Sequence, residues 1–333
     1  MSNQLIRHRS YPILICTALL IGAVLIPQGI YGEEMNADPP PPLPLLVRAN
    51  QSDTPASIAQ RILNDSSKGW MIVEYNGRAT FSGGEPVMVP TAPFQRGGLT
   101  PDGYQTVPVL AYSDIGDSSR QVSRSAFDYQ MRWLKTEGFV AITPNQLTEF
   151  MGFSGQLPRR PVLISFDTAS HRLLKTGIPI LKELGLTATI FVATNGVGVK
   201  DSMTWDQIKQ LHKDGFSIGC RGRSGRSLTR RTQTQTFEAY FRSVETELRL
   251  ARKTIETHLD EPCLFLAYPH GDTNNLVSAM AAKLGFSAAF IRQPGENPFF
   301  ADRFSIRRTP IDNRNDSEQF AKLLTTLIPA DLN

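Results

Sequence analysis

The sequence predicts an α/β fold, in which a large domain of alternating strands and helices follows a small strand–helix–helix–strand unit. From about residue 106 onward, short apolar runs typical of buried strands alternate with stretches of helical periodicity. Repeated strand–helix units of this kind build parallel sheets and suggest a barrel. Residues 46–91 carry a separate apolar helix face and a closing strand. Two domains of unequal size are therefore expected.

The composition is that of an ordinary globular protein. Of the 333 residues, 41% are hydrophobic and 20% are charged, which is enough to form a sizeable core. The 35 Lys and Arg are nearly balanced by 31 Asp and Glu, so the formal net charge is only +4. Because this excess is small for the length, no nucleic-acid partner is expected.

Residues 1–32 are predicted to be a targeting segment. Basic residues at 7–9 precede an apolar run at 11–26, which is shorter than the roughly 20 residues that a spanning helix needs. The cleavage site is poor, because position 30 lacks a small side chain. A cleaved signal peptide and an uncleaved membrane anchor both remain open. Either one predicts an exported protein, periplasmic or associated with the cell envelope.

A proline-rich linker at 33–45 follows, since five prolines between positions 39 and 44 favour an extended chain. The small domain is predicted at 46–91, with Asp53 as the N-cap of its first helix. A second linker covers 92–105, and the large domain covers 106–333.

The small domain resembles a lysin-motif (LysM) domain. The resemblance is carried by the runs SDTPASIA at 52–59, WMIVEYN at 70–76 and GEPVMVP at 84–90. Ser52 stands in place of the family's usual Gly and Pro55 in place of its usual Leu. The resemblance implies binding of N-acetylglucosamine polymers, including peptidoglycan. A spacer domain that no longer grips glycan is the alternative.

In the large domain six apolar runs are predicted strands, at 107–112, 162–167, 187–192, 216–219, 264–267 and 288–291. Six amphipathic stretches are predicted helices, at 127–137, 173–184, 204–213, 237–258, 276–284 and 317–327.

Asp167 is the best catalytic candidate. It ends the apolar run PVLISFD, and active sites of βα barrels are built at the carboxyl ends of their strands. A carboxylate in this position is also a common helix cap or turn residue, so a structural role is the alternative.

Several segments of the large domain resemble the polysaccharide deacetylases of carbohydrate esterase family 4, which share the NodB homology domain. They are SFD at 165–167, IPILKELGLTATIFV at 178–192, AYPHG at 267–271 and GFSAAF at 285–290, with opening segments at 107–112 and 127–139. The resemblance implies a distorted, incomplete (β/α) barrel. It also implies hydrolysis of N-acetyl groups on amino-sugar polymers by a bound divalent metal, commonly Zn²⁺.

The same resemblance implies that this chain has lost its metal ligands. Asp167 corresponds to the family's base, but Thr168 stands where the family has a metal-binding Asp. Arg221 and Gly225 stand where it has two His. A hydroxyl, a guanidinium and a glycine are poor or absent ligands for Zn²⁺. No metal or other cofactor is therefore expected.

Other residues near this site carry further hypotheses. Tyr268 and His270 lie in the turn that lines the family's site, where His270 replaces the usual Tyr. Asp167, His171 and His270 form the alternative set for an unorthodox metal site. Arg221 is expected to fill the emptied metal position and to pair with Asp167.

Arg221, Arg223 and Arg226 open an arginine-rich segment that no acid interrupts. They are candidates for contacting an anionic glycan, and an exposed basic loop without a partner is the alternative. Cys220 and Cys263 are the only cysteines after the targeting segment. They form a disulfide if their geometry allows; two separate buried thiols are the other interpretation.

Together these features favour an exported envelope protein that binds or positions an amino-sugar polysaccharide or peptidoglycan without deacetylating it. One alternative is an active deacetylase that keeps Asp167 as its base. Another is a structural scaffold of the envelope, in which the barrel contacts another protein.

Overall fold

The computed structural model describes residues 42–94, 96–100 and 102–330. The targeting segment and most of the first linker lie outside these residues and stay predictions. Among the described helices, none combines the length and the apolar character needed to span a bilayer.

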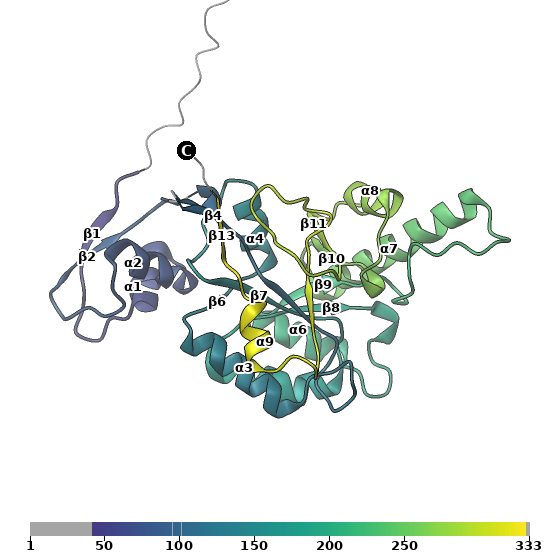
Figure 1. Ribbon diagram of the computed structural model, residues 1–333, viewed down its shortest axis with the longest axis horizontal. Coiled ribbons are helices and arrows are strands. Elements are labelled where there is room, and N and C mark those ends of the chain that lie inside the picture. Colours follow the sequence, from purple (N-terminus) through teal and green to yellow (C-terminus); the bar gives the residue numbers. More distant parts are fainter. Residues whose placement is uncertain (1–41, 95, 101, 331–333) are drawn as a thin grey trace, which may run out of the picture. The chain divides into compact units, whose positions relative to one another are not determined.

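The small unit has the predicted element order, strand–helix–helix–strand (Figure 1). Its elements are β1 (Leu45–Arg48), α1 (Pro55–Leu63), the 3-10 helix η1 (Ser66–Lys68), α2 (Gly69–Asn76) and β2 (Pro86–Val89). The two strands pair antiparallel. Ile58, Ile72 and Val87 are fully buried in a core that is separate from that of the large domain. The assignment to the LysM family stays a prediction.

Helix α1 begins one residue later than expected. Thr54, and not Asp53, is its N-cap, because Thr54 and Ser57 form a reciprocal capping box with N···O distances of 3.1 and 2.8 Å. Asp53 instead accepts a hydrogen bond from the Asn50 amide at 2.8 Å and pairs with Arg61.

The large domain is built on a parallel sheet with the strand order β11-β10-β9-β8-β7-β5-β12, and β6 pairs with β7 beside this path. The strands are β5 (Val109–Tyr112), β6 (Val140–Ala141), β7 (Pro161–Phe166), β8 (Thr189–Val192), β9 (Ser217–Cys220), β10 (Phe265–Ala267), β11 (Ala288–Phe290) and β12 (Thr309–Ile311). The six predicted strands are confirmed. Because all pairings are parallel, the carboxyl ends of the strands lie at one edge of the sheet.

The helices of the large domain follow the strands, and Figure 1 shows α3, α6 and α9 along the lower side of the sheet. Their bounds are α3 (Arg124–Thr136), α4 (Pro144–Met151), α5 (Ile178–Leu184), α6 (Trp205–Lys213), α7 (Phe237–Leu259), α8 (Asn275–Lys283) and α9 (Ser317–Lys322). Short helical turns are η2 (Arg96–Gly98), the π-helical η3 (Leu173–Gly177), η4 (Thr194–Gly196) and η5 (Pro269–Gly271).

The last predicted helix is shorter than expected. It ends at Lys322, because the chain after it joins a second sheet as β13 (Leu327–Pro329). This strand pairs antiparallel with β4 (Gly103–Gln105), which pairs in turn with β3 (Leu99–Thr100).

The segment after β11 closes the curled sheet, and the sequence patterns did not predict it. The Ile291 amide donates to the Ile306 carbonyl at 2.9 Å, and three residues later β12 pairs with β5 at the other end of the sheet. Pro310 lies within β12 and has no backbone N–H to donate to the neighbouring strand. For this reason the sequence around it does not predict a strand. The closure confirms the expected incomplete barrel and places Arg308 inside it.

Candidate functional site

The alternation of side chains along the strands decides which residues face the barrel interior. In β7, Val162, Ile164 and Phe166 pack in the larger apolar core beneath the helices, while Leu163 packs in a second core inside the barrel. Because successive side chains of a strand point to opposite faces, Asp167 is expected on the interior face. The same alternation along β9 and β11 carries Arg221 and Arg292 to that face.

Asp167 pairs with Arg308 inside the barrel. The distance between Arg308 Nη1 and Asp167 Oδ1 is 2.7 Å, and a second bond joins Nη2 to Oδ2 at 3.4 Å. The side chain of Arg308 is 0% exposed and that of Asp167 is 6% exposed. Two further acceptors hold the guanidinium at 3.3 Å each, the Ile291 carbonyl and the Ser165 hydroxyl. The guanidinium also lies over the Phe191 ring, 5.2 Å from its centre.

Three guanidiniums act on the Asp167 carboxylate. Burial by itself disfavours the charged form, but the attraction of Arg308 and Arg221, the hydrogen bonds from Arg308 and the field of Arg292 outweigh it. The pKa of Asp167 is therefore lowered from its ordinary value. A general base works best when its pKa lies near the working pH, so this carboxylate is a weak base.

The expected ion pair between Asp167 and Arg221 is not the one that forms. Arg221 lies close enough for its charge to lower the pKa of Asp167, but the hydrogen-bonded partner is Arg308. Burial lowers the pKa of Arg221 itself. A Cβ atom built on Gly225 would lie 3.5 Å from Arg221 Nη1, so the two positions expected to hold the family's His residues are neighbours.

The arginine-rich loop is anchored to α7 by Glu247, which is 8% exposed. Its Oε1 accepts hydrogen bonds from the Ser224 amide at 2.5 Å and the Ser224 hydroxyl at 2.7 Å. Arg226 also turns toward α7, with its Nε 3.7 Å from Glu247 and its Nη2 bonded to Ser243. Arg223 is exposed and donates to Asn195 at 3.2 Å. Arg223 and Arg226 therefore do not join Arg221 beside Asp167.

Tyr268 does not line this site. It follows β10 on the outer face, is fully buried and donates to the Phe304 carbonyl at 3.1 Å. Burial raises the pKa of Tyr268 to about 12. His270 is exposed in a left-handed conformation with φ of 60°. The next residue, Gly271, lies so close to Arg292 that a built Cβ would be 2.3 Å from the Arg292 Cβ.

The residues at the metal positions do not fit a divalent ion. Thr168, Arg221 and Gly225 offer no carboxylate or imidazole, and each oxygen of Asp167 already accepts a hydrogen bond from Arg308. His171 bonds Gln207 at 3.2 Å and does not converge with Asp167. Within the part of the chain that the structure describes, no three His, Cys, Asp or Glu residues are grouped to hold a metal.

Cys220 and Cys263 are free and buried. Burial raises the pKa of both thiols, that of Cys263 to about 12. Neither is therefore a reactive nucleophile in the folded protein.

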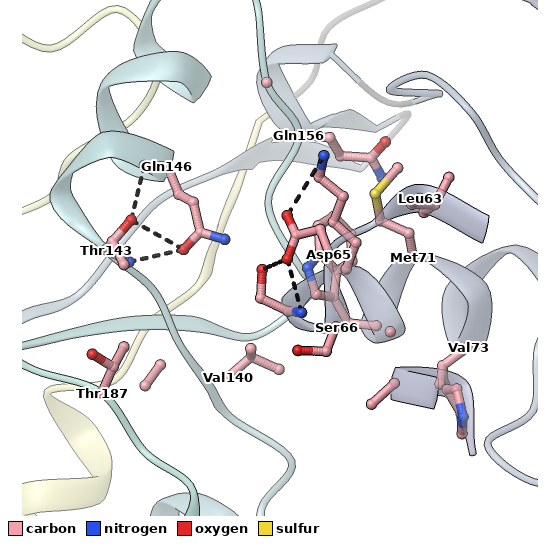
Figure 2. A pocket seen from close by; sticks show the side chains of 18 of the residues that line it. Leu63, Asp65, Ser66, Met71, Val73, Val140, Thr143, Gln146, Gln156 and Thr187 are labelled. Atoms are coloured by element: carbon pink, nitrogen blue, oxygen red, sulfur yellow. Dashed lines mark hydrogen bonds and ion pairs between the residues drawn. The ribbon is translucent and has the colours of Figure 1, made fainter. Parts of the chain in front are cut away.

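A pocket of about 1060 Å³ has none of the residues around Asp167 in its lining, and Figure 2 shows it from close by. It includes Val140 and Thr187, which lie at the amino ends of the sheet strands, opposite the edge that carries Asp167. Its polar groups serve local structure: Thr143 and Gln146 form a helix cap, and Asp65 accepts two bonds from Ser67. Because barrel enzymes act at the carboxyl edge, we take the surroundings of Asp167 as the candidate site.

The large domain is similar in sequence to known polysaccharide deacetylases. Residues 154–289 match the family model described as polysaccharide deacetylase. A Bacillus subtilis (strain 168) protein named for the polysaccharide deacetylases, YxkH, is 25% identical over 222 residues, which cover 66% of this chain and 77% of that protein. The poly-β-1,6-N-acetyl-D-glucosamine N-deacetylase of Staphylococcus aureus (strain MRSA252) is 25% identical over 198 residues, covering 56% of this chain and 67% of the relative.

The fold is shared with solved structures. The Streptococcus pyogenes deacetylase PplD, in complex with acetate, superposes with a TM-score of 0.61 at 20% identity, covering 66% of this chain and 98% of that one. The predicted fold type is thereby confirmed. Residues 154–289 are thus similar to the polysaccharide deacetylase model, and the large domain shares the fold of solved deacetylases.

Proposed function

We propose that this protein binds or positions an amino-sugar polysaccharide of the cell envelope without metal-dependent deacetylation. The observation that carries the proposal is the Asp167–Arg308 pair beside Thr168, Arg221 and Gly225. Metal-assisted amide hydrolysis needs a cation that polarises the carbonyl and a carboxylate free to take a proton from water. Here the carboxylate is already hydrogen-bonded to Arg308, and Arg221 occupies a position where the resemblance implies a metal ligand.

An amino-sugar polymer is the ligand class that the comparisons support. The S. aureus relative is named for its action on poly-β-1,6-N-acetyl-D-glucosamine. The LysM-like unit adds a second module for N-acetylglucosamine polymers, peptidoglycan included. Its binding role and the domain limits of 46–91 and 106–333 belong to the same proposal.

Export belongs to the proposal as well, because an enzyme family that acts on surface polymers fits the predicted targeting segment at 1–32. Whether that segment is cleaved or tethers the protein to a membrane is read from the mass of the N-terminal peptide of the mature protein.

A retained deacetylase activity is the second candidate, and one observation favours it. Asp167 still lies at the carboxyl edge of the barrel, where the family resemblance implies the base. Its lowered pKa and its pairing with Arg308 argue against the activity.

Two measurements on the full chain test the proposal. Calorimetric titration with N-acetylglucosamine oligomers is expected to show binding, and an acetate assay with the same oligomers and added Zn²⁺ is expected to show no release above the buffer rate. Acetate release that disappears in Asp167→Ala would establish the deacetylase instead. Absence of both binding and release would leave the scaffold role.

A further inference from the structure

The candidate site carries an excess of positive charge. We call Arg221, Arg292 and Arg308 the arginine cluster: Arg308 is hydrogen-bonded to Asp167, and Arg221 and Arg292 follow β9 and β11 on the same interior face of the sheet. Three guanidiniums and one carboxylate leave a net charge of +2 (3 − 1). The charge of Arg292 also lowers the pKa of Asp312. Asp312, however, forms an ion pair with Arg314 at 2.6 Å. The excess charge is therefore not neutralised by a further acid of the cluster.

Two of these guanidiniums have unused donors. The Nε atoms of Arg221 and Arg292 are shielded from solvent and have no hydrogen-bond partner among the described residues. A buried donor without a partner is costly, and most such groups in folded proteins are satisfied by protein, water or ligand. Both side chains are partly exposed as a whole, so a small solute has access to them. Arg308, in contrast, is fully buried and committed to Asp167.

Guanidinium groups in such a setting select a particular ligand chemistry. Their planar donor forks match the oxygens of carboxylate, phosphate and sulfate, and each such bond is strengthened where water is excluded. A neutral N-acetyl group would leave the charge of +2 uncompensated. A metal cation would be repelled.

We propose that the arginine cluster binds an oxyanion, carried by the envelope polysaccharide as a carboxylate, phosphate or sulfate group, through Arg221 and Arg292 at the edge where the deacetylase family acts. This inference rests on the proposed function for the source of the anion, but the anion site is testable by itself. Asp167 and Arg308 form its floor, and Asp167 keeps Arg308 oriented.

The first test uses free anions. Phosphate, sulfate and acetate are titrated calorimetrically into the full chain, with chloride at constant ionic strength. We expect one anion per chain, and an affinity at least about tenfold lower in Arg221→Gln and in Arg292→Gln, because each loses a charge-assisted donor fork. Arg249→Gln is the matched control. Arg249 is exposed on α7, so this substitution removes the same charge outside the arginine cluster. Its affinity is expected to equal that of the wild type.

Two further variants extend this test, and the first of them keeps it decisive if a glutamine variant folds poorly. Arg221→Lys retains the charge but lacks the fork, so its affinity is expected to lie between those of the wild type and Arg221→Gln. Asp167→Asn removes the opposing charge and is expected to bind anions at least as tightly as the wild type. No anion binding by the folded wild type, or equal loss in Arg249→Gln and Arg221→Gln, would overturn the proposal.

The second test identifies the source of the anion. Oligomers that alternate N-acetylglucosamine with glucuronate are compared with neutral N-acetylglucosamine oligomers of equal length. The anionic oligomer is expected to bind more tightly, and the difference is expected to vanish in Arg221→Gln. Equal binding of both oligomers would refute a glycan-borne anion while the proposed glycan function stands. Binding of free phosphate but of neither oligomer would support the anion site and refute the glycan function.

Discussion

Arg308 and Asp167 form a buried ion pair that joins the start of β12 to the end of β7, with Nη1 and Oδ1 2.7 Å apart. The pair therefore has two roles, one at the candidate site and one in closing the sheet. It lies at the candidate site, and it holds the segment that closes the curled sheet onto β5. A change at either residue is expected to affect stability as well as binding.

Asp167→Asn is expected to destabilise the protein by about 3 kcal/mol at pH 7, because it leaves Arg308 as a buried charge without a counterion. Urea unfolding of both proteins measures the difference in free energy. Asp128→Asn is the control, since Asp128 belongs to an exposed pair with Arg132 and its loss is expected to cost less than about 1 kcal/mol.

The same pair predicts a pH dependence. The pKa of Asp167 is lower in the folded protein than in the unfolded chain, so its contribution to stability is present above the unfolded pKa of about 3.9. It is lost as the pH falls through the folded pKa. The stability difference between wild type and Asp167→Asn is therefore expected to stay constant from pH 5 to pH 8, roughly, and to shrink below about pH 4. A difference that is unchanged at lower pH would contradict the assignment.

Restoring the family's ligands is not expected to restore a zinc site. In the triple variant Thr168→Asp, Arg221→His, Gly225→His, the last substitution meets a backbone with φ of 71°, where a side chain costs about 1–2 kcal/mol. A positive φ at position 225 therefore favours glycine and disfavours the histidine that the variant introduces. Equilibrium dialysis with Zn²⁺ checks this, and one tightly held ion per folded triple variant would show that only the side chains had changed.

Glu247→Ala is expected to loosen the arginine-rich loop, because it removes the acceptor of the Ser224 amide and hydroxyl. The expected loss of stability is about 1–3 kcal/mol. Hydrogen exchange of the Ser224 amide is expected to accelerate, whereas Glu238→Ala, on the exposed start of α7, leaves it unchanged. Unaltered protection of Ser224 in Glu247→Ala would show that other contacts hold the loop.

Cys220 and Cys263 are expected to resist a thiol reagent at pH 8 in the folded protein, since burial raises both pKa values, that of Cys263 to about 12. Both are expected to react after unfolding in urea. Intact mass after labelling measures this. Rapid labelling of the folded chain would contradict the burial, and failure to label the unfolded chain would reveal a disulfide.

The sequence predicted the strands because their runs are apolar and bounded by turn residues, and it predicted Asp167 because this carboxylate ends a buried-type strand. The sequence could not predict that Arg308 lies inside the barrel. The strand that follows it, β12, is only three residues long and contains Pro310, so it does not resemble a strand in the sequence. Because the sequence pattern does not reveal Arg308, the family resemblance indicates Arg221 as the partner of Asp167, whereas the structure pairs Asp167 with Arg308.

Two further outcomes depend on geometry that residue identity does not reveal. Strand alternation, applied to β10, would have placed Tyr268 on the outer face before the structure was known. Arg221, Arg292 and Arg308 lie near enough to Asp167 to lower its pKa because the sheet is curled, which brings together residues far apart in the chain.

We propose that a cationic cluster stands in place of a metal ion beside Asp167. Calorimetric titration of Zn²⁺ into the metal-free full chain tests it most directly. No site-specific heat is expected, in wild type and in Asp167→Ala alike. One Zn²⁺ bound per wild-type chain and lost in Asp167→Ala would contradict it.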